Sequence, residues 1–69
     1  MKLSARNALQ GKVVEVKEGV VTAEVTVDIG GGKHVVSSIT LESARNLGLA
    51  KGKDVIAIIK ASNVMLAVE

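Results

Sequence analysis

The segment VVTAEVTVDI, residues 20–29, alternates apolar and polar side chains from Val21 to Ile29. This period of two puts the apolar residues on one face of an extended chain, which is typical of a half-buried β-strand. β-branched runs at residues 12–18 and 33–41 flank the segment, and glycines separate it from both. Because glycine tolerates the positive φ of tight turns, the pattern predicts three strands joined as an antiparallel meander.

A short helix is predicted after the third strand, at residues 42–47. Thr40 can cap its N-terminus, Glu42 lies in the first turn, and Gly48 follows the last turn as a stop signal. The predicted helix has barely two turns, so it is a connection within a β-fold.

Two further strands are predicted, at residues 54–61 and 63–68, with a corner at Ser62. Five strands with one helix between the third and the fourth predict an all-β fold, a five-stranded OB-like Greek-key barrel. The alternatives are an SH3-like small barrel and an open antiparallel sheet that a partner chain completes.

The composition predicts self-association. A chain of 69 residues forms one domain, residues 1–69, and a domain of this size is marginally stable alone. It contains no Cys and one His, which excludes disulfides and a structural metal cluster as compensation. In the fourth strand Ile56 and Ile58 alternate with other apolar residues, so both faces are apolar. One face is expected to be core and the other an interface.

Charge and hydropathy predict a cytoplasmic protein without a membrane span. Nine Lys and Arg against seven Asp and Glu give a net charge of only +2, which is not a polycation. No apolar run approaches the roughly 20 residues of a transmembrane helix. The opening Met1-Lys2-Leu3-Ser4 lacks the apolar core of a signal peptide.

Catalysis is not expected. His34 is the sole imidazole, no Cys is present, and no serine has a base at a recognisable spacing. We expect His34 to be an exposed hairpin residue beside the glycine turn. The triplet Gly30-Gly31-Gly32 could form an anion-binding nest, but a hairpin loop is the favoured interpretation because no phosphate-loop pattern follows it.

Donors of hydrogen bonds lie near the ends of the predicted strands. They are Ser4, Arg6, Thr40, Ser43, Lys60 and Ser62. A tetrahedral dianion can only accept hydrogen bonds, so hydroxyls, cations and backbone N–H groups without carboxylates suit it. Each donor also has a structural explanation: turn or helix capping for the hydroxyls, a solvated charge for Arg6, and a snorkelling side chain for Lys60.

The chain resembles the molbindin, or Mop, family over nearly its whole length. The residues that carry the resemblance are Ser4-Ala5-Arg6-Asn7, Leu9, Gly11-Lys12-Val13, Gly31, Ile39-Thr40, Ser43, Leu47-Gly48-Leu49, Gly52 and Ile59-Lys60-Ala61. The opening motif alone is weak, but its combination with the late Ile-Lys-Ala and the intervening Ile-Thr-x-x-Ser, in this order, is specific.

The resemblance implies an OB-like barrel that binds molybdate or tungstate and has no organic cofactor. It also implies a homo-oligomer, a hexamer built as a trimer of dimers, with the oxyanions held between subunits. By motif, Ser4, Ala5, Arg6, Lys60 and Ala61 would come from one subunit, and Ser62 would add a donor. Thr40 and Ser43 would come from a neighbour. The family has further sites near a threefold axis, for which Thr22 is the only suggestion.

The function expected is reversible oxyanion binding for intracellular storage, buffering or homeostasis. One alternative is a module that binds single-stranded nucleic acid, but the chain has no aromatic residue on which bases could stack. The other is a purely structural oligomerisation domain, which would ignore molybdate.

Overall fold

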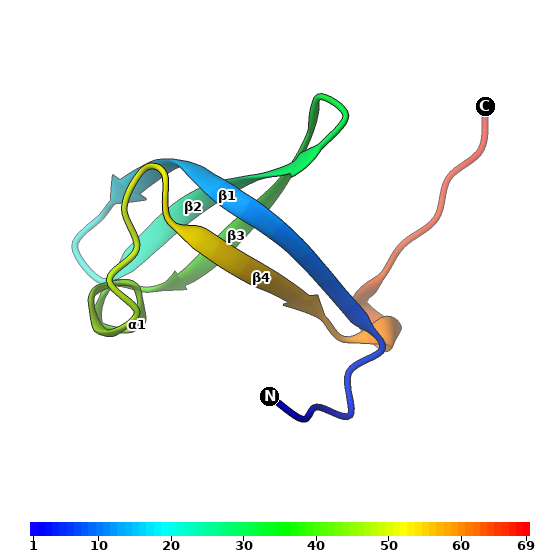
Figure 1. Ribbon diagram of the computed structural model, residues 1–69, viewed down its shortest axis with the longest axis horizontal. Helices are drawn as coiled ribbons and strands as arrows, with labels where there is room; N and C mark the ends of the chain where they lie inside the picture. Colours follow the sequence, from blue (N-terminus) through cyan, green and yellow to red (C-terminus); the bar gives the residue numbers. More distant parts are fainter.

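A computed structural model describes all 69 residues as one antiparallel sheet with a short helix (Figure 1). The elements in chain order are β1 (Asn7–Glu18), β2 (Thr22–Gly30), β3 (Lys33–Thr40), α1 (Leu41–Asn46), β4 (Asp54–Ile59) and a 3-10 turn (Ala61–Asn63). The predicted all-β class and the helix between the third and fourth strands are confirmed.

The sheet has the order β3-β2-β1-β4 and curls so that its two outer strands lie on the same side (Figure 1). The long strand β1 makes this possible because its two halves have different partners. Its second half pairs with β2 from Lys12 to Glu18, and its first half pairs with β4 from Asn7 to Lys12. The strands change partner at Lys12, next to a register shift between Val13 and Glu15.

Gly11 lies where β1 approaches the backbone of β2 closely. A Cβ at this position would stand 2.6 Å from both the carbonyl oxygen of Asp28 and the Cγ1 of Val27. Such distances are shorter than van der Waals contact, so only glycine lets β1 pass this close to β2.

The core is small and aliphatic. Five residues are buried, namely Val13, Ala23, Val25, Val27 and Ala44. The valines of β2 belong to the alternating set that the sequence predicted to face inward, and Ala44 is the residue through which α1 packs. Val55, Ala57 and Ile59 of β4 are half-buried, whereas Ile56 and Ile58 are exposed.

The predicted fifth strand at residues 63–68 is wrong. The fourth strand ends at Ile59, and the chain enters the 3-10 turn and then runs outward as an unpaired segment (Figure 1). A run of apolar residues forms a strand only where a neighbouring strand edge is within reach, and this turn directs the segment away from both outer strands of its own sheet (Figure 1).

The other predicted boundaries differ by smaller amounts. β1 begins at Asn7, five residues before the predicted residue 12, because pairing with β4 extends it over Gly11. The helix begins and ends one residue earlier than predicted, and Thr40 caps it as expected. No helix has the length and apolar character required to cross a membrane.

Candidate functional site

Six of the eight predicted site residues meet at one corner of the sheet. Asn7 at the start of β1 is paired with Ile59 at the end of β4, and its Nδ2 donates to the Ile59 carbonyl oxygen at 3.2 Å. The residues just before β1 and just after β4 therefore lie side by side. One hollow is lined by Ser4, Ala5, Arg6, Lys60, Ala61 and Ser62.

This corner is rich in donors. The 3-10 turn is closed by bonds from the Asn63 and Val64 amides, while the N–H groups of Ala61 and Ser62 have no partner in the chain. Neither Arg6 nor Lys60 takes part in the ion pairs of the chain. No Asp or Glu lines the hollow. Two free cations, hydroxyls and free amides make a set that suits an acceptor-only anion.

The remaining two predicted residues form a separate arrangement at the start of α1. Thr40 Oγ1 accepts from the Ser43 backbone N–H at 3.0 Å and donates to Ser43 Oγ at 2.8 Å. The Thr40 hydroxyl proton is thereby used, and the Ser43 hydroxyl proton remains available to an outside acceptor. Glu42, in the same turn, is exposed.

The structure does not bring the two arrangements together within one chain. Thr40 and Ser43 do not line the corner hollow, and α1 lies at the far end of β4 from the 3-10 turn (Figure 1). β4 alone has 6 residues, which at ~3.3 Å per residue extend about 20 Å. A single ion could contact both arrangements only if they came from two chains.

The other candidates from the sequence have structural roles. His34 is an exposed residue of β3 that pairs with Asp28 across the β2–β3 hairpin. The Gly30 amide donates to Asp28 Oδ1 at 2.8 Å, and all three glycines of the loop have positive φ, which confirms the hairpin loop. Thr22 pairs with Thr40 at the opposite end of the same hairpin.

Sequence reasoning assigned no role to Asn7, whose side chain joins the two halves of the corner. The signal available was its position in the motif, directly after Arg6. The apolar groove between β3 and β4 was also missed, because its existence depends on which strand edges the curl leaves open.

The fold and the corner define a class of protein: a small β-domain that gathers cations and amide donors where two paired strands end. The chain belongs to the TOBE domain family, whose model matches residues 3–66. It is 52% identical over 66 residues to molybdenum-pterin-binding protein 3 of Clostridium pasteurianum, a match that covers 96% of this chain and 97% of the relative.

Two solved structures have the same fold. MopII from Clostridium pasteurianum has a TM-score of 0.91 and 46% identity, covering 97% of this chain and 100% of MopII. The cytoplasmic molybdate-binding protein ModG, in a form with molybdate bound, has a TM-score of 0.84 and 47% identity, covering 96% of this chain and 53% of ModG.

These matches confirm the resemblance to the Mop family and the OB-like fold, apart from the fifth strand. The relatives are named for what they bind and not for a reaction, which agrees with the expectation of a binding protein rather than an enzyme.

Proposed function

We propose that the protein reversibly binds molybdate, and tungstate in the same way, at sites between subunits. The observation that carries the proposal is the corner hollow, where two unpaired cations and two free amides converge without a carboxylate. The molybdate-bound relative ModG, which is 47% identical to this chain over a match that covers 96% of the chain and 53% of ModG, supports the same class of ligand.

The site is built from two chains. Ser4, Ala5, Arg6, Lys60, Ala61 and Ser62 come from one chain, and Thr40 and Ser43 come from its neighbour. The separation of the two arrangements within one chain, with α1 and the 3-10 turn at opposite ends of β4, supports this division (Figure 1). The assembly we propose is a homohexamer, a trimer of dimers.

Each group has a separate task in the mechanism. Arg6 offers two parallel N–H donors to two oxygens of the dianion, and Lys60 supplies a second positive charge. The Ala61 and Ser62 amides and the Ser43 hydroxyl fix the remaining oxygens. Selection against sulfate follows from size: donors held at distances set for a larger ion would meet the smaller ion with stretched, weaker bonds.

The bare oxyanion, without a pterin or other organic group, is the ligand that we favour. A planar heterocycle is commonly held by aromatic stacking, and this chain has no Phe, Tyr or Trp. The residues of the corner are small or cationic, which suits a compact anion. The physiological role proposed is storage, buffering or homeostasis of the metalate in the cytoplasm.

Parallel titrations test the function. Molybdate, tungstate, sulfate and a short single-stranded oligonucleotide would each be titrated by calorimetry, and the mass of the assembly would be measured in the same buffer. We expect both metalates to bind more tightly than sulfate and the oligonucleotide. Binding of the oligonucleotide alone would favour a nucleic-acid module, and an oligomer that binds nothing would favour a structural role.

A further inference from the structure

The two cations of the corner hollow stand next to the last residue pair of the sheet. Asn7 and Ile59 are the final paired residues of β1 and β4 at this end. Arg6 directly precedes Asn7, and Lys60 directly follows Ile59. The separation of Arg6 from Lys60 therefore depends on how firmly Asn7 and Ile59 are held together.

Little else fixes the position of Arg6. A terminal pair has a paired neighbour on one side only, so the end of a strand opens more readily than its middle. Residues 1–6 belong to no helix or strand, and no hydrogen bond involves them. Without an additional contact at the terminal pair, the segment that carries Arg6 would move relative to Lys60.

The side chain of Asn7 supplies such a contact. Its Nδ2 donates a hydrogen bond to the carbonyl oxygen of Ile59 at 3.2 Å, and the two residues are 52 positions apart in the sequence. This is the only hydrogen bond in the chain through which a side chain joins two strands. Both residues are half-buried, so water competes less for the Ile59 carbonyl than it would at an exposed strand end.

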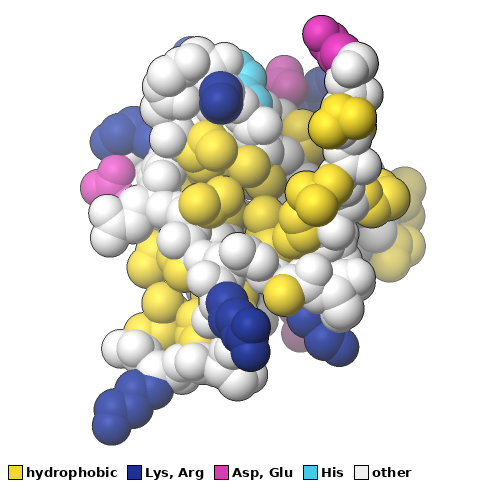
Figure 2. All heavy atoms as spheres, turned by 90° about the vertical axis from the view of Figure 1, so that its right-hand side faces the viewer, with side chains coloured by type: hydrophobic (Ala, Val, Ile, Leu, Met, Phe, Trp, Pro, Cys, Tyr) yellow, Lys and Arg dark blue, Asp and Glu magenta, His cyan; other side chains and the backbone are white.

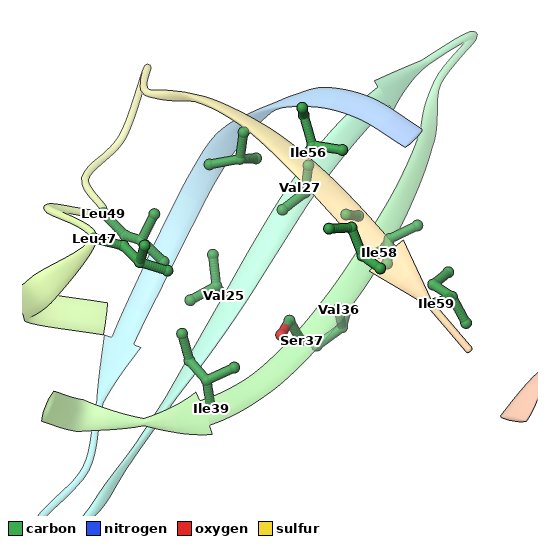
Figure 3. A pocket seen from close by; sticks show the side chains of 13 residues that line it. Val25, Val27, Val36, Ser37, Ile39, Leu47, Leu49, Ile56, Ile58 and Ile59 are labelled. Carbon is green, nitrogen blue, oxygen red and sulfur yellow. The ribbon is translucent and has the colours of Figure 1, made fainter. Parts of the chain in front are cut away.

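Ile59 is also held through its own side chain. It lies at the end of β4 and lines the apolar groove between β3 and β4 (Figure 3). Twelve of the 13 residues that line this groove are hydrophobic, so the side chain packs among apolar neighbours. The side chain and the carbonyl oxygen of Ile59 are thus fixed by different groups, which makes the residue a firm base for Lys60.

The amide of Asn7 holds the two strands together without adding charge. Figure 2, which views the molecule from the side of Figure 1 that carries the 3-10 turn, shows Lys and Arg side chains along the lower part of this face. No Asp or Glu lines the hollow. A carboxylate in place of the amide would have no N–H for the Ile59 carbonyl, and its negative charge would repel a dianion.

We infer that Asn7 is a positioning residue that sets the selectivity of the hollow. Its side-chain amide fixes the separation between Arg6 and Lys60, and this fixed separation favours a larger tetrahedral anion over a smaller one. Asn7 does not line the hollow, so it acts through its two neighbours and not on the ion. The inference rests on the proposed function, because it assigns a role within the same site.

The physical reason is that selection by size requires donors that cannot move together. Donors on loose strand ends would close around sulfate and keep hydrogen bonds of full strength. Donors held apart meet sulfate with longer and weaker bonds, while molybdate fits them. Loss of the Asn7 amide should therefore reduce the preference for molybdate, and not only the strength of binding.

A matched pair of substitutions tests the inference. Asn7→Leu removes the amide and keeps a side chain of similar size. Gln10→Leu makes the same change at an exposed residue of β1 that pairs with Ile56 of β4 and does not line the hollow. The affinity for molybdate would be measured by calorimetry, and the affinity for sulfate by competition against molybdate.

We expect Asn7→Leu to weaken molybdate binding by about tenfold, as for the loss of one hydrogen bond, and to weaken sulfate binding much less. The ratio of the two affinities should therefore fall, whereas Gln10→Leu should leave it unchanged. A purely structural role would lower both affinities by the same factor, because it would reduce the amount of folded protein. An equal loss for the two anions, or no loss, would overturn the inference.

NMR relaxation of the free protein tests the positioning directly, without a ligand. The order parameters of the Arg6 and Lys60 backbone amides should be lower in Asn7→Leu than in wild type, and unchanged in Gln10→Leu. Asn7→Ser, whose hydroxyl is too short to reach the Ile59 carbonyl, should behave like Asn7→Leu and replaces it if that variant does not fold. Order parameters equal to those of wild type would overturn the inference.

Failure of this inference is distinguishable from failure of the proposed function. Wild-type protein that prefers molybdate to sulfate, together with an Asn7→Leu variant that keeps the same preference, retains the function and removes the role of Asn7. Wild-type protein that takes up neither molybdate nor tungstate overturns the proposed function, and the selectivity assigned to Asn7 falls with it.

Discussion

Arg6 and Lys60 are the two cations of the corner, and neither has an acidic partner in the chain. Their residue types could be predicted to suit an anion, but their proximity could not be predicted from spacing. They are 54 positions apart and meet only because Asn7 pairs with Ile59. The family resemblance predicted that Arg6 and Lys60 belong to one site. Composition and periodicity alone left a structural explanation open for each of them.

Arg6→Ala is expected to abolish tight molybdate binding and leave the fold intact. The substitution removes two charge-assisted hydrogen bonds, and a loss of roughly 3 kcal/mol corresponds to about 100-fold in affinity. Arg6 is exposed, so the free energy of unfolding should change little. Calorimetry measures the affinity, and Lys33→Ala, which removes an exposed charge in the β2–β3 hairpin, is the control. Unchanged affinity in the Arg6 variant would remove Arg6 from the site.

Ser43→Ala should weaken molybdate binding by about tenfold or more, because one hydrogen bond to a charged acceptor, worth roughly 1.5 kcal/mol or more, is lost. The helix should remain stable, since Thr40 Oγ1 caps it through the Ser43 backbone N–H, which the substitution keeps. Thr40→Ala removes the cap itself and should cost roughly 1 kcal/mol of stability as well. Ser38→Ala, an exposed serine of β3, serves as the control. Identical affinities for the Ser43 and Ser38 variants would contradict a role for Ser43.

Secondary-structure elements were predicted correctly where the sequence pattern within the element itself determines its conformation. The alternation in β2 and the Thr40 cap of α1 depend on neighbouring residues, and both are confirmed. The start of β1 and the state of residues 63–68 depend on distant partners. β1 gained five residues because β4 pairs with it, and residues 63–68 found no edge in the same chain. The local sequence pattern could therefore predict neither the start of β1 nor the unpaired state of residues 63–68.

Gly11→Ala should destabilise β1 more than any surface substitution on that strand. The added Cβ would stand 2.6 Å from the Asp28 carbonyl oxygen, a backbone atom that cannot move alone. Overpacking of this kind costs about 1–3 kcal/mol. Urea denaturation at fixed protein concentration measures the loss, and Gln10→Ala, at the exposed neighbour on the same strand, is the control. Equal midpoints would show that β1 can move away from β2.

At the scale of the whole molecule, a single chain buries few residues and leaves much of its apolar surface exposed. Five buried residues form its core, while the groove, Ile56, Ile58 and the C-terminal segment leave a large apolar surface in water. The two groups of predicted site residues likewise lie apart, one in the corner hollow and the other at the start of α1. Composition alone predicted self-association. The exposed apolar surface favours it because burial would add stability, and the separation of the predicted site residues favours it because one ion could then contact both groups.

Thermal stability should therefore depend on protein concentration and on molybdate. Dissociation accompanies unfolding of an oligomer, so a hundredfold dilution should lower the melting temperature measured by calorimetry or circular dichroism. Molybdate at about 100 times its dissociation constant adds roughly 2.7 kcal/mol per site, which for a domain of this size should raise the melting temperature by at least about 5 °C. Sulfate at the same concentration should raise it less, because both anions act equally through ionic strength and differ only at the site. A melting temperature that is unchanged by dilution would show that the folded unit is one chain. Equal shifts with molybdate and sulfate would show that the corner does not distinguish the larger anion from the smaller one.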